Sequence, residues 1–148
     1  MQLELSMGEA VSDLASSSAA RTIGSGVFVD AIFSGDGSRM FAVSGNTVFV
    51  IDVASGNVLA QYNVGTRLGA IDVSPDGLKL AVVERSSNVQ SESRLYEIDL
   101  TTGAITTHSV AGTSGPFFDV SFLADGTALV SQQSIGNGAM PLGLIVFT

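Results

Sequence analysis

Residues that could contact a ligand stand in predicted loops or at the strand ends beside them. The candidates are Arg67, Glu84, Arg85, Phe117, Phe118, Gln132 and Asn137. The two phenylalanines could stack on a ligand ring, but an adjacent aromatic pair more often belongs to a core. The two arginines could contact an anion, but solvated or ion-paired side chains are the more common case. None of these residues is predicted to be catalytic.

Three aspartates could hold a cation. Asp30, Asp72 and Asp119 lie on predicted inner strands, and Asp72 stands two residues later in its strand than the other two do in theirs. Calcium takes about six to eight oxygen ligands, which a ring of carboxylates could provide. No segment carries the alternating acidic pattern of a calcium loop. We therefore favour hydrogen bonds from amides of neighbouring strands to these carboxylates, and predict no metal.

The sequence offers few other groups for catalysis or cofactor binding. His108 is the only histidine and there is no cysteine. This argues against a histidine or thiolate metal cluster and against a Ser-His-Asp triad within the chain. The glycine-rich segment Ile135–Ala139 does not lead from a strand into a helix, so phosphate binding is not predicted. We expect no cofactor.

The composition is that of a folded, acidic domain. The chain has 148 residues, of which 45% are hydrophobic and 14% charged, and its formal net charge is −8. This charge opposes binding to nucleic acid and to anionic membrane surfaces. No apolar run reaches the ~20 residues that a membrane-spanning helix requires. The lack of cysteine fits an exported bacterial protein. The compartment stays open, with an extracellular or periplasmic location favoured.

Three Asp-Gly pairs mark repeated hairpins. They begin at Asp36, Asp76 and Asp125, which are 40 and 49 residues apart. Apolar residues alternate with polar or small ones before each pair, and a second apolar stretch follows each pair. This pattern predicts two strands joined by a tight turn, in which glycine takes the positive φ angle that the turn requires.

A second signature repeats after the hairpins. Val48–Gly56 matches Leu95–Gly103 position by position at a spacing of 47 residues, and partial copies occur at Leu3–Gly8 and Leu144–Phe147. Four-stranded antiparallel units of about 40 to 50 residues are typical of β-propeller blades. An immunoglobulin-like sandwich also has many short strands, but it has no reason to repeat one turn chemistry at fixed spacing.

We therefore predict an all-β fold, a β-propeller segment of about three four-stranded antiparallel blades that is incomplete as a ring. The blades are expected at residues 28–65, 68–110 and 117–148, the last without its outer strand, and residues 1–14 are expected to supply two strands of a preceding blade. Known propellers have about four to eight blades. The chain is therefore expected either to belong to a longer protein, which we favour, or to close a ring as a homo-oligomer.

Two stretches carry a family resemblance: Ser74–Gly77 with Leu80–Val83, and Asn46–Asp52 with Gly56 and Tyr62–Gly65. They resemble the bacterial YVTN-type repeat, a family that, with its lactonase-like relatives, forms propellers that commonly have seven blades. The WD40 repeat is a poorer match, because neither its Gly-His nor its Trp-Asp dipeptide occurs in the chain. The resemblance implies the fold and says little about function, because these residues build turns and blade faces.

The longer predicted loops lie on the side of the blades at which the inner strands begin, the upper face. They are Ala15–Val27, Glu84–Arg94 and Gln132–Gly143. Because loops carry function more often than the scaffold does, we expect a non-catalytic binding or scaffold module that holds a protein or small-molecule ligand on this face. Two alternatives remain. One is part of a propeller enzyme of lactonase or quinoprotein type, with its site mostly on other blades. The other is a structural repeat of a surface or adhesion protein.

Overall fold

The computed structural model describes residues 26–85, 92–111, 116–132 and 144–148, and within these ranges it contains strands and turns but no helix. The first antiparallel sheet consists of β1 (Asp30–Phe33), β2 (Arg39–Ser44), β3 (Thr47–Asp52) and β4 (Val58–Asn63). The second consists of β5 (Leu68–Val73), β6 (Lys79–Glu84), β7 (Glu92–Asp99) and β8 (Ile105–Ala111). The third consists of β9 (Phe117–Phe122), β10 (Ala128–Gln132) and β11 (Leu144–Phe147).

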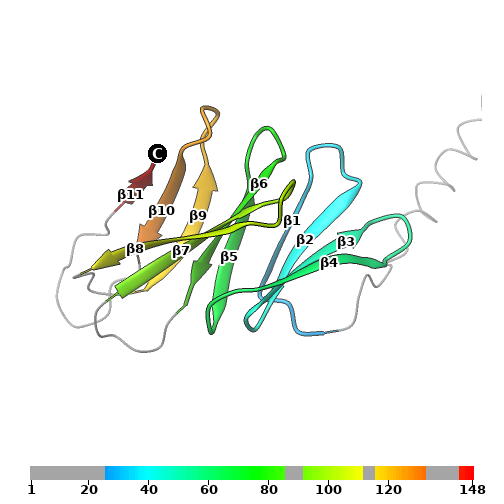
Figure 1. The fold of residues 1–148 in the computed structure, drawn as a ribbon, viewed down its shortest axis with the longest axis horizontal. Helices are drawn as coiled ribbons and strands as arrows, with labels where there is room; N and C mark the ends of the chain where they lie inside the picture. Colours follow the sequence, from blue (N-terminus) through cyan, green and yellow to red (C-terminus); the bar gives the residue numbers. More distant parts are fainter. Residues whose placement is uncertain (1–25, 86–91, 112–115, 133–143) are drawn as a thin grey trace, which may run out of the picture.

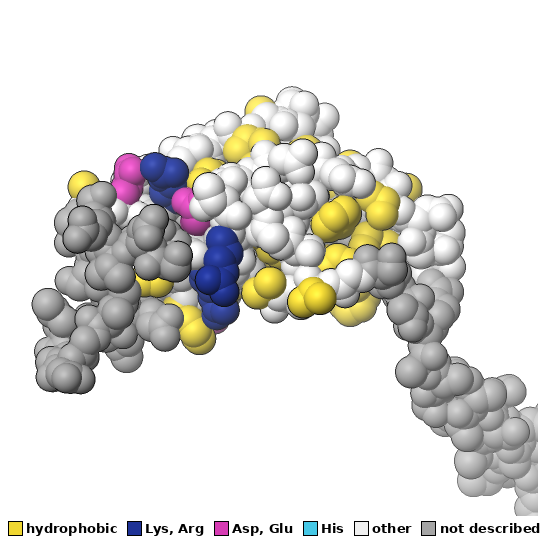
Figure 2. Space-filling view, turned by 90° about the horizontal axis from the view of Figure 1, so that it is seen from below, with side chains coloured by type: hydrophobic (Ala, Val, Ile, Leu, Met, Phe, Trp, Pro, Cys, Tyr) yellow, Lys and Arg dark blue, Asp and Glu magenta, His cyan; other side chains and the backbone are white. Residues whose placement is uncertain are grey.

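The three sheets stand side by side, each with its first strand innermost (Figure 1). β1 lies next to β5, and β5 lies next to β9. Figure 2 views the same arrangement from the end at which β5 and β9 begin. The prediction of an all-β propeller segment with an open ring is confirmed. The sheets span residues 30–63, 68–111 and 117–147, and the strands expected in residues 1–14 lie outside the described residues.

One loop is shorter than the sequence indicates. The segment Glu84–Arg94 was expected to connect two strands, but β7 already begins at Glu92. Its first residues form a ladder with the end of β8, where Glu92 is opposite Ala111. The polar residues before Leu95 therefore extend the strand, because a long partner strand satisfies their backbone groups. No helix that could span a bilayer occurs in the described part of the chain.

The predicted Asp-Gly hairpins are confirmed. Gly37, Gly77 and Gly126 have φ angles of 71°, 73° and 84°, a region that favours glycine. The aspartate before each glycine accepts a hydrogen bond from the backbone amide two residues after itself, as Asp36 does from the amide of Ser38 at 2.9 Å. The hydroxyls of Ser34 and Ser38 also donate to Asp36, and these bonds lower the pKa of that carboxyl to about 2.

The second repeated turn follows the third strand of each four-stranded sheet. The amide of Gly56 donates to the carbonyl of Asp52, and the amide of Gly103 donates to the carbonyl of Asp99, both at 2.7 Å. Each aspartate side chain also accepts bonds from the residues of its own turn. The matched segments that the sequence shows thus build the same turn twice.

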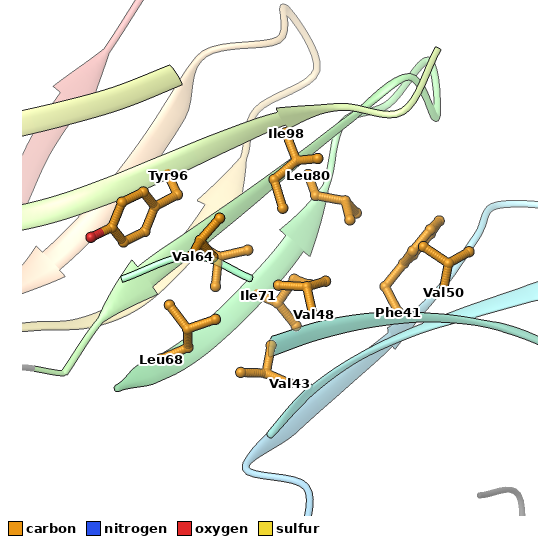
Figure 3. Close-up of a cluster of buried hydrophobic side chains, with 11 residues drawn as sticks. Phe41, Val43, Val48, Val50, Val64, Leu68, Ile71, Leu80, Tyr96 and Ile98 are labelled. Carbon is orange, nitrogen blue, oxygen red and sulfur yellow. The ribbon is translucent and has the colours of Figure 1, made fainter. Parts of the chain in front are cut away.

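Apolar side chains fill the space between neighbouring sheets. Between the first and second sheets, buried residues from both sides point toward one another (Figure 3). They are Phe41, Val43, Val48, Val50, Val64, Leu68, Ile71, Leu80, Val82, Tyr96 and Ile98. A second cluster joins the second and third sheets, with Ala81, Val83, Leu95, Phe117, Val120, Ala128 and Val130. Burial of this apolar surface is the main force that holds the sheets together.

Aspartate side chains also join the innermost strands. Asp30 on β1 accepts a hydrogen bond from the amide of Ile71 on β5 at 3.0 Å, and Asp72 on β5 accepts one from the amide of Phe122 on β9 at 2.6 Å. We call each of these contacts an aspartate bridge. With its other oxygen, each carboxylate accepts the amide of the next residue in its own strand, Ala31 or Val73, at 2.9 Å.

The carboxylates thus bind strand amides, as we favoured from the sequence. Asp119 on β9 accepts the amide of Val120 at 2.9 Å, but no described residue donates to its second oxygen, Oδ2. Within the described ranges, no group of three or more His, Cys, Asp or Glu side chains is arranged to hold a metal ion.

The aspartate bridge predicts unequal effects for two matched substitutions. Asp72→Asn replaces the acceptor that faces the amide of Phe122 with a group that can donate, so we expect the free energy of unfolding to fall by about 2 kcal/mol. Asp119→Asn changes a carboxylate with the same local bond but no bridge, and should change it by less than about 1 kcal/mol. Urea unfolding followed by circular dichroism measures both. Equal losses would show that the bridge adds nothing.

Candidate functional site

Several of the predicted site residues meet at the end of the blades where β5 and β9 begin and β6 ends. The amide of Arg85 donates to the carbonyl of Arg67 at 2.7 Å. The Arg85 guanidinium carbon lies 5.2 Å from the centre of the Phe118 ring, within cation–π range. Figure 2 shows basic side chains beside apolar ones at this end of the molecule. We call the surface formed by Arg67, Arg85 and Phe118 the rim.

Arg85 is held in place by its surroundings. Its aliphatic stem covers Gly69, where a Cβ atom would lie 2.8 Å from Cγ of Arg85, so a larger residue at this position would push the arginine aside. Its Nε atom is buried and has no hydrogen-bond partner among the described residues. An unsatisfied buried donor is rare in folded proteins and calls for an explanation, such as an acceptor that arrives with a ligand.

The two adjacent phenylalanines have opposite environments. Phe117 is fully buried, at 0% exposure, and its ring meets that of Phe147 edge to face with centroids 6.1 Å apart. Phe118 is 47% exposed and lies under Arg85. The ladder between β9 and β10 shifts register here, because Asp119 pairs with Ser131 and Phe117 with Gln132, so Phe118 is left without a partner in the ladder. The structure therefore places Phe118 on the surface and Phe117 in the core.

Glu84 has a clear structural contact set. It is 5% exposed, and its Oε1 accepts hydrogen bonds from the amide and the hydroxyl of Thr66, at 2.7 and 2.9 Å. The Tyr96 hydroxyl donates to Oε2 at 3.1 Å. Gly65 lies directly against this group, because a Cβ on it would be 2.7 Å from Oε1. Glu84 thus anchors the connection between the first and second sheets. Burial, the main cause, raises the pKa of Tyr96.

Three further residues considered from the sequence are Gln132, Asn137 and His108. Gln132 lies half-buried at the end of β10, opposite Phe117, and interacts with other groups. Asn137 lies outside the described residues. His108 on β8 lies 3.8 Å from a Glu97 oxygen and has its ring 5.5 Å from that of Phe147. His108 thus lies on the outer strand of the second sheet and not at the rim.

A cleft that the sequence did not predict lies at the opposite end of the blades. It has a volume of about 480 Å3 and lies between the Asp-Gly turns of the first two sheets. Asp36 and Asp76 line it, but both carboxylates already accept bonds within their turns. Hydrogen bonds from Ser34 and from Ser74, respectively, are the largest cause of the lowered pKa of each. The repeated Asp-Gly turns could have indicated this cleft in the sequence, because equivalent turns of neighbouring blades lie side by side.

Comparisons with known proteins support the fold. No protein-family model matches the chain, and no curated protein matches it. Among solved structures, the chain is similar to the hydrazine synthase of Kuenenia stuttgartiensis, with a TM-score of 0.66 and 18% sequence identity over 80% of this chain. The match spans 33% of the hydrazine synthase chain. At this identity the similarity shows a propeller-like fold alone, and membership of the YVTN-type family stays a prediction.

The role of Glu84 can be tested by a matched pair of substitutions. Glu84→Ala leaves the amide and hydroxyl of Thr66 without their buried acceptor, so we expect the free energy of unfolding to fall by about 3 kcal/mol. Glu97→Ala removes a partly exposed carboxylate that pairs with Lys79 at 2.8 Å, and should lower it by less than about 1 kcal/mol. Urea denaturation gives both values. If Glu84→Ala is as mild as Glu97→Ala, the anchoring role is wrong.

Proposed function

We propose that the chain is a non-catalytic binding or scaffold module of a β-propeller repeat protein, and that it holds an anionic group of a protein or small-molecule ligand at the rim. The observation that carries the proposal is the state of Arg85. Its guanidinium lies over Phe118, its stem is held against Gly69, and its buried Nε has no acceptor among the described residues.

The ion pairs of other basic residues support this choice. Lys79 pairs with Glu97 at 2.8 Å, and Arg94 pairs with Glu92 at 3.0 Å. Arg67 and Arg85 form no ion pair with any residue that the structure describes. The rim is therefore a local positive surface on a chain whose formal net charge is −8.

The shape of the rim indicates the kind of anion. A guanidinium that stacks on a ring keeps the N–H groups along its edge directed outward, in the fork that matches a carboxylate. The 47% exposed Phe118 adds an apolar surface beside it. A ligand with a carboxylate next to an aromatic or aliphatic group would satisfy both. Such a contact needs no bond-making step, in keeping with a binding module.

Titration with phenylacetate tests this proposal, because the compound carries a carboxylate and a ring. We expect it to shift the backbone amide NMR signals of Arg67, Arg85 and Phe118 at millimolar concentration, and to bind roughly tenfold more weakly to Arg85→Ala, which corresponds to one lost charge-assisted contact. The control variant Lys79→Ala changes a basic residue at the other end of β6 that already has a carboxylate partner, and should bind as the unmodified chain does.

Phenethylamine provides the matched control ligand, since it keeps the ring and reverses the charge. The proposal is wrong if phenethylamine shifts the same signals as strongly as phenylacetate does. It is also wrong if Arg85→Ala binds phenylacetate with unchanged affinity.

A further inference from the structure

The outward face of the third sheet repeats an interface but has no partner in the described structure. In the strand ladders, Leu144 stands where Val48 and Leu95 stand in the other sheets, each opposite the end of the second strand. Val48 is 0% and Leu95 2% exposed, because the following sheet covers them, whereas Leu144 is 67% exposed. Val146 is 56% exposed, whereas its counterparts Val50 and Glu97 are 4% and 31% exposed.

The hydrogen bonding of Asp119 points the same way. Asp30 and Asp72 use one oxygen for the amide of the next residue and the other for an amide of the following sheet. Asp119 makes the first bond, to the amide of Val120 at 2.9 Å. Its Oδ2 has no donor within the described ranges. Asp119 is thus half of an aspartate bridge on the same face as Leu144.

The bridges follow a strict register. Asp30 lies six residues before its turn aspartate, and it binds the amide of Ile71, which lies five residues before the turn aspartate of the second sheet. Asp72 lies four residues before Asp76, and it binds the amide of Phe122, which lies three residues before Asp125. Each aspartate therefore accepts two amides that lie at the same distance before a turn aspartate, one in its own sheet and one in the following sheet. That distance is five residues for Asp30 and three residues for Asp72.

This register decides which strand can pair with Asp119. Asp119 lies six residues before Asp125, as Asp30 does before Asp36. It therefore requires a following strand in which the amide five residues before the turn aspartate has no acceptor of its own. In the first sheet of a second copy that amide belongs to Ala31, and it already donates to Asp30. The amide of Ile71 is the kind required, because the residue before it is Ala70 and offers no carboxylate.

We propose that the outward face of the third sheet docks a further propeller blade whose inner strand carries its aspartate at the Asp72 position and not at the Asp30 position. The partner is therefore not the first sheet of a second copy of this chain. Its apolar side chains cover Leu144 and Val146, and its inner strand donates an amide to Oδ2 of Asp119. The two kinds of aspartate position then alternate around the ring.

The test extends the full chain with a blade of the required kind. Residues 1–147 are followed directly by a copy of residues 52–111, which supplies an outer strand for the third sheet and then a second-sheet blade. The matched control carries Ala70→Asp and Asp72→Ala in the added copy, which moves its aspartate to the Asp30 position. Asp119→Asn is introduced into both extended chains and into the 148-residue chain.

Thermal unfolding followed by circular dichroism gives the result. We expect Asp119→Asn to lower Tm by about 5 °C in the first extended chain, and by no more than about 1 °C in the control and in the original chain. Equal shifts in all three would overturn the proposal. So would an added blade that stays unfolded, shown by a strand signal that does not increase with the extension.

Sedimentation velocity on the original chain tests the rival occupant. The proposal expects no association that depends on Asp119. Concentration-dependent dimers that disappear in Asp119→Asn would make a second copy the occupant and would overturn the proposal.

Discussion

The structure depends on one constraint, the backbone amides along the open edge of each innermost strand. In an antiparallel pair every second residue directs its N–H away from its partner strand, so the first strand of each sheet has a row of unpaired donors. Asp30 and Asp72 supply acceptors for these donors in their own strand and in the next sheet. The carboxylates therefore satisfy an edge and set how neighbouring sheets align.

The rim is a consequence of that alignment. Arg85 directly follows the second strand of the second sheet and Phe118 belongs to the first strand of the third, so their contact exists only when the two sheets are in register. Glu84 acts one residue earlier, since it holds Thr66 and with it the connection from the first sheet. The surface that we propose for ligand binding thus takes residues from one sheet and its neighbour, while its supports lie in the core between them.

Much of this could be predicted from the sequence, because turn chemistry repeats at nearly constant spacing. The Asp-Gly pairs located the hairpins, and the positions of Arg67, Arg85 and Phe118 at strand ends located one end of the blades. The pattern could not say which of Phe117 and Phe118 enters the core, since both are apolar and a shift of one residue in register exchanges them. Nor could it show that Glu84 is buried, because its partners Thr66 and Tyr96 come from two other segments.

Backbone amide hydrogen exchange, measured residue by residue by NMR, tests the aspartate bridge most directly. Ile71, Phe122 and Phe33 all direct their amides away from their partner strands, but only the first two donate to an aspartate of the preceding sheet. We expect the amides of Ile71 and Phe122 to exchange at least tenfold more slowly than that of Phe33, which has no acceptor among the described residues. Equal exchange at all three would contradict the idea that carboxylates join the sheets.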